Sequence, residues 1–269
     1  MTQESDREPR VLLSFDFDGT FLEADKEPPF DPRVLEYLLE LKRWGVVWSI
    51  NTGRTLPHTV EAITQFRIVP TPDFIIARES EIYWCNEFNR WLDYGDWNKR
   101  CVKDHKRLHK TAKKFFRSFR KYVENDTAAE WISTPIEPAG IHASSLEEMD
   151  SICDTIESVG PPDDVGYHRN SVYLRFNHRG YSKGSALSHL GKSLGIGPEF
   201  RLVVGDNHND LSMLQENVAH GIACPSNAIP EIKAHVRAIG GFVATKPVTG
   251  GVIEALEHYL YTEEILPAP

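Results

Sequence analysis

The sequence predicts an α/β fold, a Rossmann-like doubly wound parallel sheet with a second α/β domain inserted into it. Apolar runs of strand length alternate with segments of helical period near the N-terminus, and the same alternation returns after residue 180. The stretch between these two regions differs in character. We therefore expect a core formed by residues 1–85 and 179–269, interrupted by an inserted α/β domain at residues 86–178.

The first part of the expected core contains three strands and two helices. The strands are the apolar runs at residues 11–15, 46–50 and 74–77. The first helix begins at Asp31 and Pro32, because aspartate is a good N-cap and proline suits the first helical position, and Gly45 suits its end. A second helix is expected at residues 57–65. This alternation indicates a parallel sheet with helical crossovers.

The expected inserted domain is marked by aromatic and basic residues. Residues 81–97 are rich in Trp and Tyr and suit a hairpin. Residues 99–121 carry eleven Lys and Arg residues against one acidic residue, with apolar residues near helical spacing. We interpret this stretch as one basic amphipathic helix with a solvated charged face; the alternative is that it steers anionic substrates. A helix at 144–159 and a strand at 172–176 follow.

The second part of the core resumes the α/β alternation. We expect helices at residues 183–194, 210–215, 230–236 and 251–259, and strands at residues 201–204 and 220–223.

The composition indicates a packed globular protein. The 269 residues are 41% apolar, and no apolar run approaches the ~20 residues that a membrane helix needs. Residues 1–10 lack the apolar segment of a secretion signal, and the four cysteines form no C-x-x-C pair. We therefore expect a cytoplasmic protein, a monomer or small homo-oligomer, that binds no membrane. The net charge of −9 disfavours a dedicated nucleic-acid binder.

Two carboxylates directly follow the first expected strand. Asp16 and Asp18 are two residues apart, so in an extended chain they share one side at a separation of ~7 Å. Ligands bind beyond the carboxyl ends of strands in open α/β sheets, and two carboxylates this close repel unless a cation or a shared proton relieves them. The pair therefore predicts a site for a hard cation such as Mg²⁺.

Three other segments carry polar groups at comparable positions. Thr52 follows the second strand, Lys183 opens a helix, and the run from Gly205 to Asp210 follows a later strand. If the strands are parallel neighbours, the strand-end groups meet at one edge of the sheet and Lys183 can reach them. A cation together with Lys183 and the Thr52 hydroxyl would reverse the negative local field. Such a site suits phosphoryl transfer, which depends on positioning and charge neutralisation.

With these motifs the chain resembles the haloacid dehalogenase superfamily, specifically its Cof-like and sucrose-phosphatase-like phosphatases with a type IIB α/β cap. The resemblance covers roughly residues 1–85 and 180–260. The matching motifs are Asp16-Phe17-Asp18-Gly19-Thr20, Thr52-Gly53-Arg54, Lys183-Gly184 and Gly205-Asp206-x-x-Asn209-Asp210. The resemblance implies that residues 86–178 are a cap that determines substrate specificity.

The resemblance implies roles for the acidic residues. Asp16 would be the nucleophile that forms an aspartyl-phosphate, and Asp18 would protonate the leaving oxygen and then take a proton from water. Mg²⁺ would bind the Asp16 carboxylate, the Asp18 backbone carbonyl and the Asp206 carboxylate. Asp210 would not bind the metal directly but would orient Lys183 or a metal-bound water.

The resemblance also implies a binding site for the phosphorylated substrate. Thr52 and Lys183 would hold phosphoryl oxygens and act in catalysis, and Gly53 and Asn209 would help to bind the substrate. From the residues alone, Arg54 either contacts the substrate or pairs with a carboxylate. Where many relatives have an Asn-Gly pair after the third strand, this chain has Arg78-Glu79-Ser80.

The implied activity is Mg²⁺-dependent hydrolysis of a small phosphorylated metabolite, with a sugar or polyol phosphate expected as substrate. A phosphomutase built on the same core and a non-catalytic phospholigand-binding protein are the alternatives. A phospho-signalling receiver also combines acceptor Asp, Thr and Lys, but Asp18 and the large insertion disfavour it.

Overall fold

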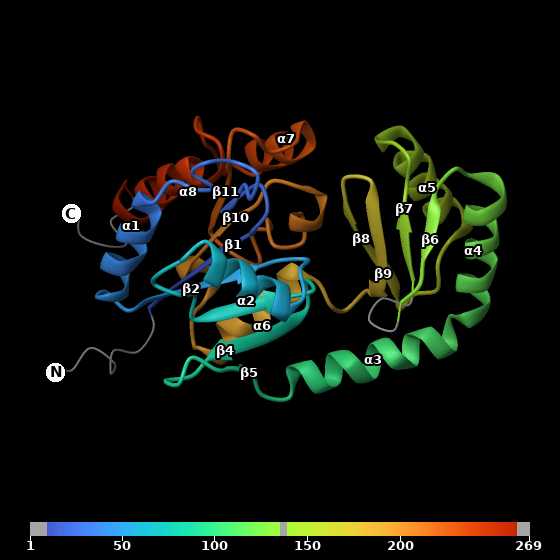
Figure 1. Cartoon of the computed structure of the whole chain (residues 1–269), viewed down its shortest axis with the longest axis horizontal. Coiled ribbons are helices and arrows are strands. Elements are labelled where there is room, and N and C mark those ends of the chain that lie inside the picture. Colours follow the sequence, from blue (N-terminus) through green and yellow to red (C-terminus); the bar gives the residue numbers. More distant parts are fainter. Residues whose placement is uncertain (1–9, 135–138, 263–269) are drawn as a thin grey trace. The chain divides into compact units, whose positions relative to one another are not determined.

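A computed structural model describes residues 10–134 and 139–262 of the chain (Figure 1). The chain divides into two compact units, a core unit of residues 1–95 and 183–269 and an inserted unit of residues 96–182. The inserted unit begins at residue 96 rather than at residue 86 because strand β5 (Trp91–Asp93) pairs with strand β4 (Glu81–Cys85) in the sheet of the core unit.

The core unit is built on an eight-stranded sheet in the order β12-β11-β10-β1-β2-β3-β4-β5. Neighbouring strands from β12 to β3 are parallel, whereas β4 and β5 are added antiparallel at one edge. The α/β fold expected from the sequence is therefore confirmed, as is the hairpin after β3. The other strands are β1 (Val11–Phe15), β2 (Val46–Asn51), β3 (Phe74–Ala77), β10 (Arg201–Val204), β11 (Gly221–Cys224) and β12 (Phe242–Val243).

Helices cover both faces of this sheet (Figure 1). On one face, Leu13 and Phe15 of β1 lie in an apolar cluster with side chains of α1, α2 and α8. On the other face, Asn51 of β2 donates from Nδ2 to the Lys183 carbonyl oxygen of α6, at 3.2 Å. The α-helices of the unit are α1 (Arg33–Lys42), α2 (Leu56–Gln65), α6 (Lys183–Ser193), α7 (Pro230–Ala238) and α8 (Val248–Leu256).

Short helical turns complete the core unit. The segments Pro198–Phe200 and His208–Asp210 are 3₁₀-helical, and Glu257–Thr262 forms a π-helix after α8. The helix expected at residues 210–215 is therefore only the short turn His208–Asp210. Asn207 caps this turn: its side chain accepts from the backbone N–H of His208.

The inserted unit pairs a four-stranded antiparallel sheet, in the order β6-β7-β9-β8, with three helices. Its apolar core includes Phe119 and Ile152 from two of the helices and Phe176 from the sheet. The elements are α3 (Trp97–Thr111), α4 (Lys113–Asp126), β6 (Glu130–Ile132), β7 (Gly140–His142), α5 (Leu146–Val159), β8 (Val165–Asn170) and β9 (Tyr173–His178).

The basic stretch of the inserted unit forms two helices and not the single helix expected from the sequence. The break falls at Ala112, whose ψ of 13° departs from the helical conformation, and the apolar period continues across it because Leu108, Ala112 and Phe116 are all buried. Of the described helices, none combines the length and the apolar character needed to cross a bilayer.

Candidate active site

The candidate site lies at the carboxyl ends of three neighbouring strands. In the sheet order β10-β1-β2, strand β1 is followed by Asp16, β2 by Thr52, and β10 by Gly205 and Asp206. Because these strands are parallel, the residues that follow them lie at the same edge of the sheet, where open α/β sheets bind ligands.

Lys183 is a fully buried cation in this site. Its Nζ lies 2.5 Å from Asp16 Oδ1 and 2.6 Å from Asp210 Oδ1, so it joins residues that are 167 and 27 positions away in the sequence. Burial alone would lower the pKa of the Lys183 ammonium, but the charges of Asp16 and Asp210 raise that pKa above its usual value. Lys183 is therefore charged at any physiological pH.

Local packing explains how Lys183 reaches the site from the first residue of α6. Asn51 holds the Lys183 carbonyl from β2, as described above. A Cβ atom on Gly184 would lie 1.8 Å from the Ser212 carbonyl oxygen, so a glycine is needed for α6 to pack this closely against the segment after β10.

Three buried carboxylates form a cluster beside Lys183. Oxygens of Asp16, Asp206 and Asp210 all lie within 4.8 Å of one another. Asp210 uses its second oxygen, Oδ2, to accept from the backbone N–H groups of Asp206 and Asn207, at 2.8 and 2.9 Å. One ammonium faces three carboxylates, so the cluster needs further positive charge, and its hard oxygen atoms suit Mg²⁺.

Burial and the repulsion between neighbouring carboxylates raise the pKa values of two residues in this cluster. Burial, followed by the charge of Asp210, raises the pKa of Asp16 well above its usual value of 3.8. Burial and Asp210 likewise raise the pKa of Asp206 to about 6. The ionised carboxylates are thus disfavoured in the folded protein unless a cation or protons compensate them.

Metal-free protein is therefore expected to lose stability as the pH rises through about 6. The raised pKa of Asp206 means that the folded state holds a proton that the unfolded state has already released, and the corresponding stability is full below pH ~4 and lost above ~6. The loss should be on the order of a few kcal/mol. Mg²⁺ should restore this stability, so it should raise the Tm much more at pH 8 than at pH 4.5.

Thermal unfolding with and without Mg²⁺ at both pH values checks this prediction. Asp206→Asn should flatten the pH dependence and reduce the gain from Mg²⁺. An equal rise in Tm at both pH values would show that Mg²⁺ binds elsewhere.

The loop after β1 is shaped to hold Asp206. Thr20 donates from Oγ1 to Asp206 Oδ1 at 2.6 Å, and Asn227 donates to the Gly19 carbonyl at 2.7 Å. Gly19 has a φ of 84°, and a Cβ there would lie 2.7 Å from Asp206 Oδ2. Only glycine combines this conformation with such close contact.

The Asp18 side chain lies outside the carboxylate cluster. It is 46% exposed and accepts two hydrogen bonds from Arg54, at 2.8 Å from Nε and 2.5 Å from the terminal nitrogen. The Arg54 guanidinium also lies 5.2 Å from the centre of the Phe17 ring. The structure shows Arg54 paired with a carboxylate, and its contact with a substrate stays a prediction.

The other residues expected at the substrate-binding site lie along the loop after β2 and the turn after β10. Thr52 is buried, and its hydroxyl accepts from the backbone N–H of Arg54 at 3.1 Å; Gly53 is exposed. Asn209 is buried and donates from Nδ2 to Glu79 Oε1 at 2.9 Å. In the sequence, Glu79 is visible only as a departure from a family pattern. The signal that could have marked it is an acidic residue at a turn position where many relatives have glycine.

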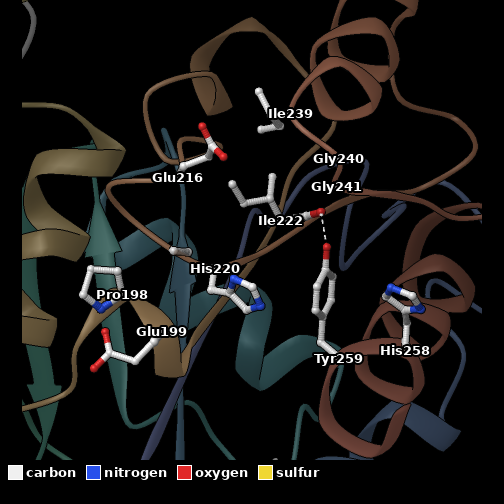
Figure 2. Close-up of a pocket in the computed structure, with 11 residues that line it drawn as sticks. Pro198, Glu199, Glu216, His220, Ile222, Ile239, Gly240, Gly241, His258 and Tyr259 are labelled. Atoms are coloured by element: carbon white, nitrogen blue, oxygen red, sulfur yellow. Dashed lines mark hydrogen bonds between the residues drawn. The ribbon is translucent and has the colours of Figure 1, made fainter. Parts of the chain in front are cut away.

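A separate cavity of about 420 Å³ lies at the opposite end of the strands (Figure 2). Pro198, His220 and Gly241 in its wall precede β10, β11 and β12, whereas the carboxylate cluster follows the carboxyl ends of β1 and β10. Tyr259 closes one side by donating to the Ile222 carbonyl at 3.2 Å. Within residues 10–134 and 139–262, none of the buried side-chain atoms without a hydrogen-bond partner belongs to this cavity.

The chain is similar to several proteins that are named as phosphatases. The chain is 24% identical over 258 residues to the 5-amino-6-(5-phospho-D-ribitylamino)uracil phosphatase YcsE of Bacillus subtilis, covering 93% of this chain and 95% of that protein. It is 26% identical over 224 residues to the phosphoglycolate phosphatase of Thermoplasma volcanium, covering 82% and 88%. The fold resembles the sucrose-phosphatase of Synechocystis, solved with sucrose and phosphate, with a TM-score of 0.71, 21% identity and 93% and 98% coverage.

A family model also matches most of the chain. Residues 71–256 match the family model of haloacid dehalogenase-like hydrolases, a span that includes Lys183 and the segment from Gly205 to Asp210. The fold and the sheet-edge cluster agree with that match. The chain therefore belongs to the haloacid dehalogenase-like hydrolase family, as its motifs predicted, and is an enzyme whose relatives are phosphatases.

Proposed function

We propose that this protein is a Mg²⁺-dependent phosphatase that hydrolyses a small phosphorylated metabolite through an aspartyl-phosphate intermediate. The observation that carries the proposal is the arrangement around Asp16: a buried carboxylate at a sheet edge, 2.5 Å from a buried lysine and within 4.8 Å of oxygens of two further aspartates. Such a site can hold a phosphoryl group and the cation that neutralises it.

In the first step, the Asp16 carboxylate attacks the phosphorus atom. A bond forms between an Asp16 oxygen and phosphorus, the bond to the ester oxygen breaks, and Asp18 donates a proton to that leaving oxygen. The Asp18 carboxyl group lies outside the buried cluster and is partly exposed, where a leaving group can reach it. To donate a proton, it would have to release at least one of its two hydrogen bonds with Arg54.

In the second step, water hydrolyses the aspartyl-phosphate. Asp18 takes a proton from the water as the water oxygen bonds to phosphorus, and the bond from Asp16 to phosphorus breaks, which restores both carboxyl groups and releases inorganic phosphate. Lys183 and Thr52 would hold the phosphoryl oxygens. The carboxylates of Asp16 and Asp206 and the carbonyl of Asp18 would bind Mg²⁺, which neutralises negative charge at the phosphoryl group.

We infer that the substrate is a sugar or polyol phosphate and that the inserted unit contributes its specificity, as caps do in this family. The B. subtilis relative, whose name places a phosphate on a ribityl chain, supports a polyol phosphate. The phosphoglycolate phosphatase supports a small carboxylated substrate instead, so the two chemistries need a direct comparison.

Phosphate release from sugar, polyol, carboxylic-acid and nucleotide monophosphates, with Mg²⁺ or with a chelator, tests the proposal. We expect turnover that needs Mg²⁺, and one phosphate released per substrate consumed. Asp18→Asn should lower kcat by about 10²–10⁴-fold, the usual contribution of a general acid–base group. Conversion of a substrate into its positional isomer without phosphate release would identify a phosphomutase. Binding of a phosphate ester without turnover would indicate a non-catalytic phospholigand-binding protein.

A further inference from the structure

The turn between β3 and β4 has an unusual backbone conformation. Arg78 and Glu79 both have positive φ, 50° and 63°, and the Ser80 N–H donates to the Ala77 carbonyl at 3.1 Å to close the turn. Glycine, asparagine and aspartate usually occupy these two positions, because other L-residues are strained there. Strain of this kind persists where the surrounding structure enforces it, often at functional sites.

The turn is held against the loop that carries Thr52. The Glu79 N–H donates to the Thr52 carbonyl at 2.9 Å, and the Arg78 N–H donates to the Arg54 carbonyl at 2.8 Å. These two bonds tie the turn to the loop that follows β2. The backbone therefore has little freedom to move Glu79 away from the site.

The Glu79 side chain is part of the candidate site. It is only 3% exposed, and its Oε1 accepts from Asn209 Nδ2 at 2.9 Å. A Cβ on Gly53 would lie 3.4 Å from the same oxygen, and the negative charge of Glu79 also contributes to the raised pKa of Lys183. Glu79 thus adds a fourth carboxylate to a site that already holds Asp16, Asp206 and Asp210.

The contact with Glu79 determines which way the Asn209 amide faces. The Asn209 amide nitrogen faces Glu79 and donates to its Oε1, because a carboxylate oxygen is an acceptor. Asn209 Oδ1 is then left buried, with no hydrogen-bond partner among the described residues. A buried acceptor in this state is costly, and a ligand that donates a hydrogen bond to it would relieve the cost.

We propose that Glu79 is a positioning residue that makes this site select phosphate esters with a neutral hydroxyl group near the phosphate. It holds Asn209 with Oδ1 available to a substrate hydroxyl, and its negative charge opposes a second anionic group such as a carboxylate. This inference rests on the proposed phosphatase function and narrows it: the enzyme should prefer ribitol 5-phosphate to phosphoglycolate.

Glu79→Gln tests the charge, because glutamine keeps the size of the side chain and an oxygen that can accept from Asn209. The ratio of kcat/KM for phosphoglycolate to that for ribitol 5-phosphate should rise about tenfold, the effect of one charge several ångströms away in a partly buried site. The affinity for inorganic phosphate in the presence of Mg²⁺ should also increase several-fold. An unchanged ratio would overturn the inference while leaving the phosphatase function intact.

The phosphate affinity separates the two hypotheses if neither ester is hydrolysed. That result would reject the proposed phosphatase function for these substrates. The inference would then be judged by the calorimetric Kd of inorganic phosphate: tighter binding to Glu79→Gln supports the role of Glu79, and an equal Kd overturns it.

Glu79→Gly tests positioning, with Arg78→Gly as the matched control. Both changes relieve one left-handed residue of the same turn, but only the first removes the partner of Asn209; the Arg78 side chain lies 3.6 Å from Glu81. Both variants should keep or raise the Tm. Glu79→Gly should lower kcat for ribitol 5-phosphate by about tenfold or more, the effect expected from loss of a charge-assisted hydrogen bond, and Arg78→Gly should not. Equal kcat values in the two variants would overturn the positioning role.

Discussion

Asp16→Asn should abolish phosphate release and at the same time stabilise the metal-free protein. An amide is a poor nucleophile and cannot form the aspartyl-phosphate, so kcat should fall by at least about 10⁴-fold. The pKa of Asp16 is raised because burial and Asp210 disfavour its charged form more than Lys183 favours it. Removal of that charge should therefore raise the free energy of unfolding of the metal-free protein at pH 7.5.

A loss of activity together with a gain in stability would distinguish Asp16→Asn from a variant that is inactive because it is misfolded. Chemical denaturation without metal and single-turnover phosphate release should be measured on the same preparations. Asp154→Asn, a change of one exposed aspartate on α5, is the matched control and should alter neither quantity. Activity within a hundredfold of the unmodified enzyme would exclude Asp16 as the nucleophile, and a loss of stability would show that its ion pair with Lys183 outweighs the repulsion.

Lys183→Met should have the largest effect on folding stability. It leaves Asp16 and Asp210 buried without the ammonium that lies within 2.6 Å of both, and such a broken buried pair costs about 3–5 kcal/mol. Activity should fall by about 10²–10³-fold as well, because a fixed positive charge that faces the phosphoryl group is lost. Denaturant unfolding and kcat at saturating Mg²⁺ measure the two effects.

A second substitution separates the two roles of Lys183. Lys183→Met combined with Asp210→Asn removes one of the unpaired carboxylates and should recover part of the stability, whereas activity should stay low. Lys192→Met, in the same helix but exposed, is the control and should behave like the unmodified protein. Full activity in a folded Lys183→Met variant would contradict the proposed role in phosphoryl binding.

The larger elements and the chemistry at the strand ends could be predicted because their signals are local. Apolar runs such as residues 11–15 and 202–204 are typical of central strands of a parallel sheet, and the polar residues that follow them then lie at the edge of that sheet. Elements with weak local signals were missed or misjudged. Strands β6 and β7 have three residues each, too few to show a period, and the break at Ala112 falls inside an uninterrupted apolar stripe.

By itself, the sequence determined the fold class, the family and the residue types that gather at the sheet edge, since these follow from patterning and from motifs within single segments. Only the tertiary structure decided how those residues pair. Three such pairings join segments that lie between 27 and 167 positions apart in the sequence. They are the burial of Lys183 between Asp16 and Asp210, the pair of Arg54 with Asp18, and the contact of Glu79 with Asn209. Such pairings depend on which elements pack together and how closely, and no local pattern encodes that geometry.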